Sequence, residues 1–347
     1  MGDFYDINYK LYNMLDINGE KPEVFIADGN RTAGKSFSIK SKILKEALEK
    51  EDENQFIYLY RFKDDMPGCA DSFFGDVVDV KYEGAEYEEK SLASGKIRLM
   101  LFEGKEVGFA LAVNIARKYK QMSAVFRNVG NMFFDEYQDE DNVYVPMEVQ
   151  KLISIHTTVA RGKGKNIRYV PLYLASNTVS ILNPYYSTFG INKRLKTNTR
   201  FLRGEGWVFE RTFNKNAAEA FQNSGFNRAF KNNGYFQFAS ENQYLNDNYA
   251  LIEKPKGRGS YMLTIKNDQT LYGVYRYPSC VYVSKSYDES FLYRVCFTVN
   301  DVTDDRFMRI GTTNYLVQMM RTEFNRGNVR FQDLECKNTF LDMVSFL

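Results

Sequence analysis

Histidine, tryptophan and cysteine are scarce in this sequence. Its 347 residues include one histidine, one tryptophan and four cysteines. None of the cysteines, Cys69, Cys280, Cys296 and Cys336, belongs to a C-x-x-C pair, which argues against a zinc site. We expect four reduced thiols in an intracellular protein. His156 alone cannot build a histidine metal site or a catalytic triad, so a histidine on a helix surface is the simpler interpretation.

Long apolar runs and a large net charge are also lacking. No stretch approaches the ~20 apolar residues that cross a bilayer, and the acidic N-terminal residues do not resemble a signal peptide. The net charge is only +2, so any nucleic-acid contact must come from local basic clusters. Hydrophobic residues make up 44% and aromatic residues 16%, which is globular composition with enough chain for two domains.

The order of predicted elements divides the chain into three parts. Alternating strands and helices predict an α/β domain over residues 1–205, whereas residues 206–242 read as a linker and 243–347 as a β-rich domain. In the first part we expect strands at 24–27, 55–62, 130–136 and 167–178, helices at 37–48 and 146–162, and short strands and turns over 71–110. In the last part we expect strands at 260–277, 280–287 and 293–299, followed by a helix at 314–327.

The segment GNRTAGKS, residues 29–36, matches the pattern G-x-x-x-x-G-K-[ST] without a mismatch. Such a loop between a strand and a helix surrounds phosphates with backbone N–H groups and with the positive end of the helix dipole. Lys35 is expected to neutralise the β- and γ-phosphates, and the Ser36 hydroxyl to bind Mg²⁺. Arg31 is either a second cation for the γ-phosphate or a solvent-facing side chain. The predicted nucleotide-binding residues are Gly29, Asn30, Arg31, Thr32, Ala33, Gly34, Lys35 and Ser36.

Two further strand ends carry the polar groups that ATP hydrolysis requires. Asp135 follows the apolar run MFF and would hold Mg²⁺ through water, while Glu136 would orient and polarise the attacking water. Asn177 ends the next strand, where an amide can sense the γ-phosphate, although an asparagine in a turn is the alternative. Arg161 is either an arginine finger for a neighbouring subunit's ATP or a cation at a helix C-terminus.

The sequence resembles the DNA-packaging ATPases, or DNA encapsidation proteins, of small tailed bacteriophages with protein-primed genomes, which are distant relatives of the large terminases. The resemblance covers nearly the whole chain and is carried, in order, by GNRTAGKS, QFIYLYRFK, FFDEYQDEDNVYVPMEV, TTVARGKGKNIR, LASNTVSILNPYY and ENQYLNDNYALIEK. It implies a P-loop ATPase domain of the additional-strand (ASCE) type with a mostly parallel sheet. A linker and an RNase H-like, vestigial nuclease domain of the α+β class would follow.

The resemblance also implies an activity and its partners. A ring of subunits, typically a pentamer, would sit at the portal of a procapsid in the host cytoplasm, outside the mature virion and without a membrane. ATP and Mg²⁺ would drive double-stranded DNA inward, in some relatives with a structural packaging RNA. Arg161 falls at the family's trans-acting arginine, Arg31 at an arginine inside the loop, and Lys63 at a DNA-gripping lysine. Relatives tend to carry two arginines where this chain has Tyr60-Arg61, so Arg61 is a second candidate for DNA contact.

Two other functions compete with a packaging motor. One is a large terminase with an active nuclease, which would need converging carboxylates on two metal ions. Asp288, Asp301, Asp304 and Asp305 are available, but their spacing shows no site, and we expect no cleavage. The other is a nucleotide-gated DNA- or portal-binding protein without sustained turnover, against which Glu136 and Asn177 argue.

Overall fold

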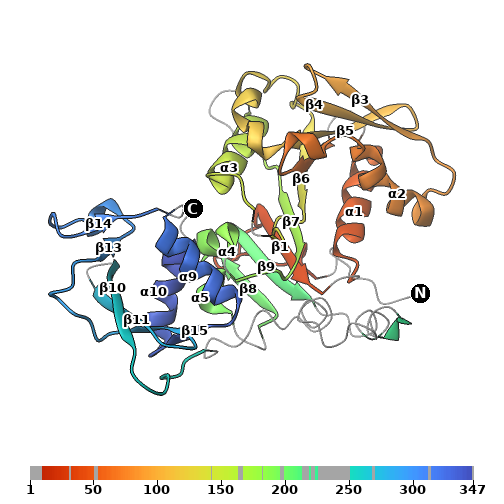
Figure 1. The fold of residues 1–347 in the computed structure, drawn as a ribbon. Coiled ribbons are helices and arrows are strands. Elements are labelled where there is room, and N and C mark those ends of the chain that lie inside the picture. Colours follow the sequence, from red (N-terminus) through yellow and green to blue (C-terminus); the bar gives the residue numbers. More distant parts are fainter. Residues whose placement is uncertain are drawn as a thin grey trace. The chain divides into compact units, whose positions relative to one another are not determined.

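The computed structural model describes residues 10–30, 33–50, 54–141, 143–162, 167–181, 183–195, 199–212, 219, 223–225, 251–267, 270–311 and 314–345. The chain forms two compact units (Figure 1). The first comprises Met1–Val179 and Thr199–Tyr244, and the second comprises Ser180–Asn198 and Leu245–Leu347.

A nine-stranded sheet of order β3-β4-β5-β2-β6-β7-β1-β9-β8 forms the centre of the first unit. Its strands are β1 (Val24–Gly29), β2 (Gln55–Tyr60), β3 (Tyr87–Leu92), β4 (Ile97–Phe102), β5 (Lys105–Ala112), β6 (Val129–Asp135), β7 (Leu172–Asn177), β8 (Phe201–Gly204) and β9 (Trp207–Thr212). The six strands from β5 to β9 in this order are parallel, and antiparallel pairs finish both edges. Strand β7 lies between β1 and β6, which is the additional strand that the resemblance implied.

Helices cover both faces of this sheet (Figure 1). Helices α1 (Lys35–Glu49) and α2 (Cys69–Lys81) lie on one face, and α3 (Glu148–Val159) lies on the other with the 3₁₀ segment η2 (Val113–Gln121). The 3₁₀ turn η1 (Lys63–Asp65) links β2 to α2. The central strands are buried on both faces, which explains their near-continuous apolar sequences.

Helix α2 corrects the expectation of short strands and turns over residues 71–110. Its buried side chains, Ala70, Phe73, Phe74, Val77 and Val78, recur at helical spacing and pack into the core beside α1. The strands β3, β4 and β5 that follow do agree with the expectation. The glycine at position 75 lies within α2, so it marks no turn.

The predicted domain boundary at residue 205 falls inside the β8–β9 hairpin, and β9 pairs in parallel with β1. Most of the predicted linker, together with the motif ENQYLNDNYALIEK up to residue 250, lies outside the described residues.

The second unit contains a six-stranded sheet of order β14-β13-β10-β11-β12-β15. Its strands are β10 (Ser260–Asn267), β11 (Thr270–Arg276), β12 (Val281–Ser284), β13 (Arg294–Cys296), β14 (Met308–Arg309) and β15 (Val329–Phe331). Its helices are α4 (Pro184–Phe189), α5 (Ile191–Arg194), η3 (Val299–Asp301), α9 (Tyr315–Asn325) and α10 (Leu334–Ser345). Helix α4 contacts α10, so the segment after β7 packs with the C-terminal residues. Across the described parts of both units, no helix is long and apolar enough to span a membrane.

Candidate nucleotide-binding site

The phosphate loop follows the strand β1 and ends at the start of α1, as the sequence predicted. Gly34 caps α1 with φ of 80°, a left-handed conformation that disfavours any side chain. Gly29 lies so close to β9 that an added Cβ would stand 2.2 Å from the Thr212 hydroxyl oxygen. Both glycines of the motif are therefore required by backbone geometry. Arg31 and Thr32 lie outside the described residues.

Lys35 is buried beneath this loop. Its ammonium donates to the backbone carbonyl oxygens of Gly29 at 3.3 Å and Asn30 at 2.9 Å. Burial lowers the pKa of Lys35 to about 8, although the carboxylates of Asp28 and Asp135 oppose the shift. An arriving phosphate would supply the negative charge that this buried cation needs.

Ser36 and Asp135 meet at the base of the loop, although 99 residues separate them in sequence. The Ser36 hydroxyl donates to the Asp135 carboxylate at 2.7 Å, so the two groups that would hold Mg²⁺ already lie together. Burial raises the pKa of Asp135, and the nearby Lys40 ammonium opposes this shift. Glu136 follows with φ of 53° and an exposed side chain, which leaves its carboxylate accessible beside the metal position.

Lys40 contributes to this site without any signal in the motif. It lies on α1, five residues after Lys35, and is 5% exposed. Its ammonium donates to the carbonyl oxygen of Ser72 on α2 at 2.7 Å and lies 3.8 Å from the Asp135 carboxylate. A second buried cation therefore supports the carboxylate that would face Mg²⁺.

Strand register places Asn177 beside the phosphate loop. Asn177 pairs with Gly29, the first residue of the loop, and is half-buried at the end of β7. That Asn177 senses the γ-phosphate stays a prediction.

Gln138 links the ends of three strands at this edge. Its amide nitrogen donates to the buried Asp28 carboxylate at 2.9 Å, and its amide oxygen accepts from the Val179 backbone N–H at 3.1 Å. The Tyr137 hydroxyl donates to the same Asp28 carboxylate at 2.7 Å. Asp28, Tyr137 and Gln138 were not among the predicted site residues, because only the sheet order brings β1, β6 and β7 together.

Arg61 and Lys63 have different environments. The Arg61 side chain is buried, with donor bonds to the Glu148 carboxylate at 3.0 Å and the Tyr137 carbonyl at 2.7 Å. The prediction that Arg61 contacts DNA is therefore not supported, because its guanidinium joins β2 to the start of α3. Lys63 is half-exposed at the first position of η1, and the Asn114 side chain fixes its backbone N–H at 3.1 Å.

Arg161 lies at the amino edge of the sheet, which is formed by the amino ends of the parallel strands. The phosphate loop lies at the carboxyl edge, which is formed by their carboxyl ends. Helix α3 begins after the carboxyl end of β6 and finishes before the amino end of the parallel strand β7, so it runs back across the sheet. Its 12 residues span about 18 Å at 1.5 Å per residue. Arg161 is exposed just beyond α3 and forms an antiparallel bridge with Ile167.

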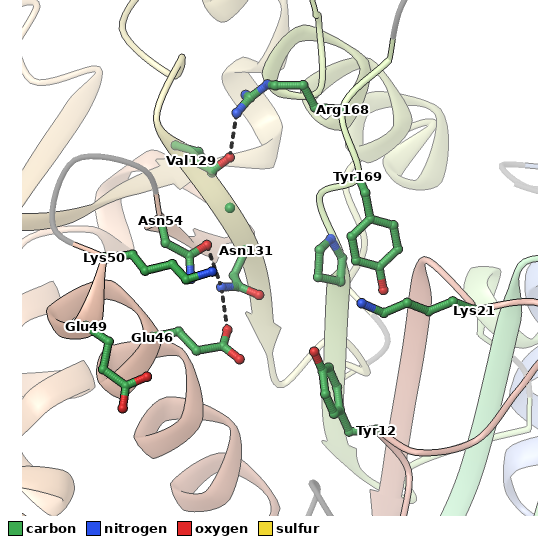
Figure 2. Close-up of a pocket in the computed structure, with 12 residues that line it drawn as sticks. Tyr12, Lys21, Glu46, Glu49, Lys50, Asn54, Val129, Asn131, Arg168 and Tyr169 are labelled. Carbon is green, nitrogen blue, oxygen red and sulfur yellow. Dashed lines mark hydrogen bonds between the residues drawn. The ribbon is translucent and has the colours of Figure 1, made fainter.

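A polar cavity of about 440 Å³ occupies the same amino edge (Figure 2). It lies between the end of α1 and the starts of β6 and β7, with Glu46, Asn54 and Asn131 on one wall and Tyr12 and Tyr169 on the other. The Lys21 ammonium stands 4.2 Å from the centre of the Tyr169 ring. This cavity is distinct from the phosphate loop.

Three of the four acidic candidates of the second unit form local hydrogen bonds or ion pairs. Asp288 accepts from the backbone and hydroxyl of Ser290, and Asp304 pairs with Arg306 at 2.8 Å. Asp301 accepts from the Thr298 hydroxyl at 2.6 Å. Within the described ranges, no group of three or more histidine, cysteine, aspartate or glutamate residues could hold a metal ion.

The sequence of this chain matches known proteins along almost its whole length. The family model of the podovirus DNA encapsidation protein (Gp16) matches residues 8–345. The chain belongs to this family. It is 25% identical over 315 residues to the DNA packaging proteins of Bacillus phages PZA and phi29, covering 89% of this chain and 90% of each relative.

Two solved structures share the fold of this family member. A chain of the bacteriophage Phi-29 viral genome packaging motor assembly superposes with a TM-score of 0.54 and 22% identity, covering 99% of this chain and all of that one. A chain of the Phi-28 gp11 DNA packaging motor superposes with a TM-score of 0.56 and 17% identity, covering 100% of this chain and 99% of that one. The predicted resemblance to DNA encapsidation proteins is thus confirmed.

Proposed function

We propose that this protein is the ATP-hydrolysing subunit of a ring-shaped motor that moves double-stranded viral DNA through a portal into a procapsid. Family membership and the DNA-packaging relatives support this proposal. The convergence of Lys35, Ser36 and Asp135 at one strand edge supports binding of ATP with Mg²⁺. Glu136 polarises the attacking water, and Asn177 senses the γ-phosphate.

The observation that carries the proposal is the separation of Arg161 from its own phosphate loop. Arg161 lies at the amino edge of the sheet and the phosphate loop at its carboxyl edge, with the length of α3 between them. An arginine side chain cannot span that distance, so Arg161 would act on a neighbour's ATP. A head-to-tail contact that closes into a ring brings opposite edges of successive subunits together. The proposed ring has five subunits and includes a structural packaging RNA as a partner.

Mixing two inactive variants tests whether Arg161 acts in trans. Glu136→Gln subunits keep the arginine and lose hydrolysis, whereas Arg161→Ala subunits keep the hydrolytic site and lose the arginine. Assembled together on procapsids with DNA, they should release phosphate from ATP, because a Glu136→Gln subunit completes the site of its Arg161→Ala neighbour. If Arg161→Ala protein alone hydrolyses ATP normally on procapsids, the assignment is wrong.

DNA would pass at the carboxyl edge, where η1 presents Lys63. A lysine contact with the phosphate backbone is independent of sequence, as translocation along a genome requires. The motor would act in the host cytoplasm at the portal vertex and be absent from the mature virion.

The second unit is proposed to be an RNase H-like domain without nuclease activity. In its sheet, β11 is antiparallel to β10 and β12, while β13 and β14 are parallel to β10 on the other side. This 3-2-1-4-5 order supports an RNase H-like fold, with β15 added beside β12. Incubating plasmid DNA with the protein and Mg²⁺ or Mn²⁺ tests the activity, because linear product would contradict it.

A further inference from the structure

Arg168 holds the end of the helix that precedes Arg161. Its guanidinium donates to three backbone carbonyl oxygens, those of Val159 at 2.5 Å, Phe126 at 3.0 Å and Val129 at 3.0 Å. Val159 is the last residue of α3 and Val129 is the first of β6. Figure 2 shows the bond to Val129 at the upper wall of the cavity. A single side chain therefore ties the C-terminus of α3 to the turn that enters the Asp135 strand.

The backbone of Arg168 continues this attachment to Arg161. The Arg168 N–H donates to the Ala160 carbonyl at 2.8 Å, and Arg161 pairs with Ile167 in the adjoining bridge. The two arginines therefore lie on two short chain segments that pair side by side in antiparallel orientation. The position of the Arg161 backbone relative to the sheet depends on where Arg168 is anchored.

The side chains of Arg161 and Ile167 are exposed, and that of Arg168 is half-buried. The Ile167 side chain is 79% exposed, and Arg168 is among the residues that line the polar cavity. The anchor itself is firm, because Phe126 is fully buried against Phe109 and Tyr119. Burial lowers the pKa of Arg168, and guanidinium remains charged where an ammonium would be weakened. The planar guanidinium reaches the three carbonyls from two separate nitrogens, a spread of donors that the single ammonium nitrogen of lysine does not offer.

We propose that Arg168 is a positioning residue that sets the reach of Arg161 toward the neighbouring subunit's ATP. This inference rests on the proposed trans action of Arg161. A cation bonded to the final carbonyls of a helix also stabilises the helix dipole, so a purely structural role for Arg168 is the competing explanation. If Arg168 positions Arg161, its substitution impairs only the subunit that donates Arg161. If its role is purely structural, the substitution impairs the donating and the accepting subunit alike.

Mixed rings separate these explanations because each subunit both donates an arginine and accepts one. In the donor test, Glu136→Gln/Arg168→Lys subunits are mixed with Arg161→Ala subunits on procapsids with DNA. In the acceptor test, Glu136→Gln subunits are mixed with Arg161→Ala/Arg168→Lys subunits. Phosphate release from ATP is measured at saturating and limiting ATP. The matched control donor is Glu136→Gln/Arg127→Lys, since Arg127 is an exposed arginine that bonds one carbonyl in the same turn.

We expect the Arg168→Lys donor to lower the rate at saturating ATP by a factor of ten or more relative to the Glu136→Gln donor. A misplacement of about 1 Å can cost about 100-fold in rate. The acceptor test and the Arg127→Lys control should stay within about twofold. Equal loss in donor and acceptor tests, or no loss in the donor test, would overturn the positioning role. If the Glu136→Gln and Arg161→Ala pair fails to complement, the trans action itself is refuted and the inference falls with it.

Discussion

The buried Lys35 predicts an unusual pH dependence of stability in the nucleotide-free protein. The folded state lowers the pKa of Lys35 from 10.5 to about 8 by burial. Between these two values the unfolded chain keeps a proton that the folded chain has released. The free energy of unfolding must therefore rise as pH increases through this window. With 1.36 kcal/mol for each pKa unit, the full rise is about 3 kcal/mol.

Comparison with Lys35→Met isolates this contribution. The substitution also removes the hydrogen bonds to the Gly29 and Asn30 carbonyls. Their loss from the protonated state is a constant offset in the comparison, and their weakening on deprotonation is already part of the folded-state pKa. Titrations of other groups occur in both proteins and cancel in the difference. The difference in stability, wild type minus Lys35→Met, should therefore increase by about 3 kcal/mol from pH 7 to pH 10.5. Urea unfolding at several pH values without nucleotide measures it.

A constant difference across this range would show that Lys35 keeps an ordinary pKa, and burial would not be the factor that prepares the loop for phosphate. Saturating ATP and Mg²⁺ provide a second check. A bound triphosphate keeps Lys35 charged in the folded state. The stability difference, wild type minus Lys35→Met, should therefore lose most of its pH dependence when ATP is saturating. Lys35→Met protein should show no stabilisation by nucleotide.

Three further outcomes follow from the same contacts. Lys63→Ala should weaken DNA binding and reduce the dependence of log affinity on log salt by about one unit, whereas exposed Lys105→Ala should not, as a salt titration would show. Arg61→Met should destabilise the protein by about 3–5 kcal/mol in urea, because the buried Glu148 carboxylate would lose its guanidinium partner, and Arg61→Met/Glu148→Leu should recover much of that loss. Gly34→Ala should cost about 1–2 kcal/mol, since φ of 80° strains a side chain, and unchanged stability would refute that strain.

The sequence predicted best where a chemical pattern and a local backbone requirement coincide. The loop from Gly29 to Ser36 needs glycines at fixed positions, and Asp135 ends an apolar strand, so both were found without a structure. Helix α2 was missed because its apolar side chains stand among glycine and acidic residues that resemble turns. Which of these side chains form the buried face of α2 becomes clear only when α1 and the sheet are in place to pack against them.

Contacts between distant strand ends were beyond prediction for a different reason. Arg61 was a candidate for DNA contact because the resemblance places it where relatives tend to carry two arginines. The structure buries it because Glu148, 87 residues later, supplies its charge partner. Arg168 bonds backbone carbonyls, and Gln138 joins the Asp28 carboxylate to the Val179 backbone; residue types do not reveal which backbone groups lie nearby. Such roles require the sheet order, which a single sequence does not contain.

The Gln138 contacts also bear on how the site connects to the rest of the chain. Gln138 joins the Asp28 carboxylate at the end of β1 to the backbone of Val179. Val179 ends the first of the two segments that make up the first unit. Ser180 begins the segment of the second unit whose helix α4 contacts α10. Only Thr178 separates Val179 from Asn177, the side chain proposed to sense the γ-phosphate. A displacement of the Asn177 backbone at the end of β7 would therefore reach Ser180, the first residue of that segment, through three peptide bonds.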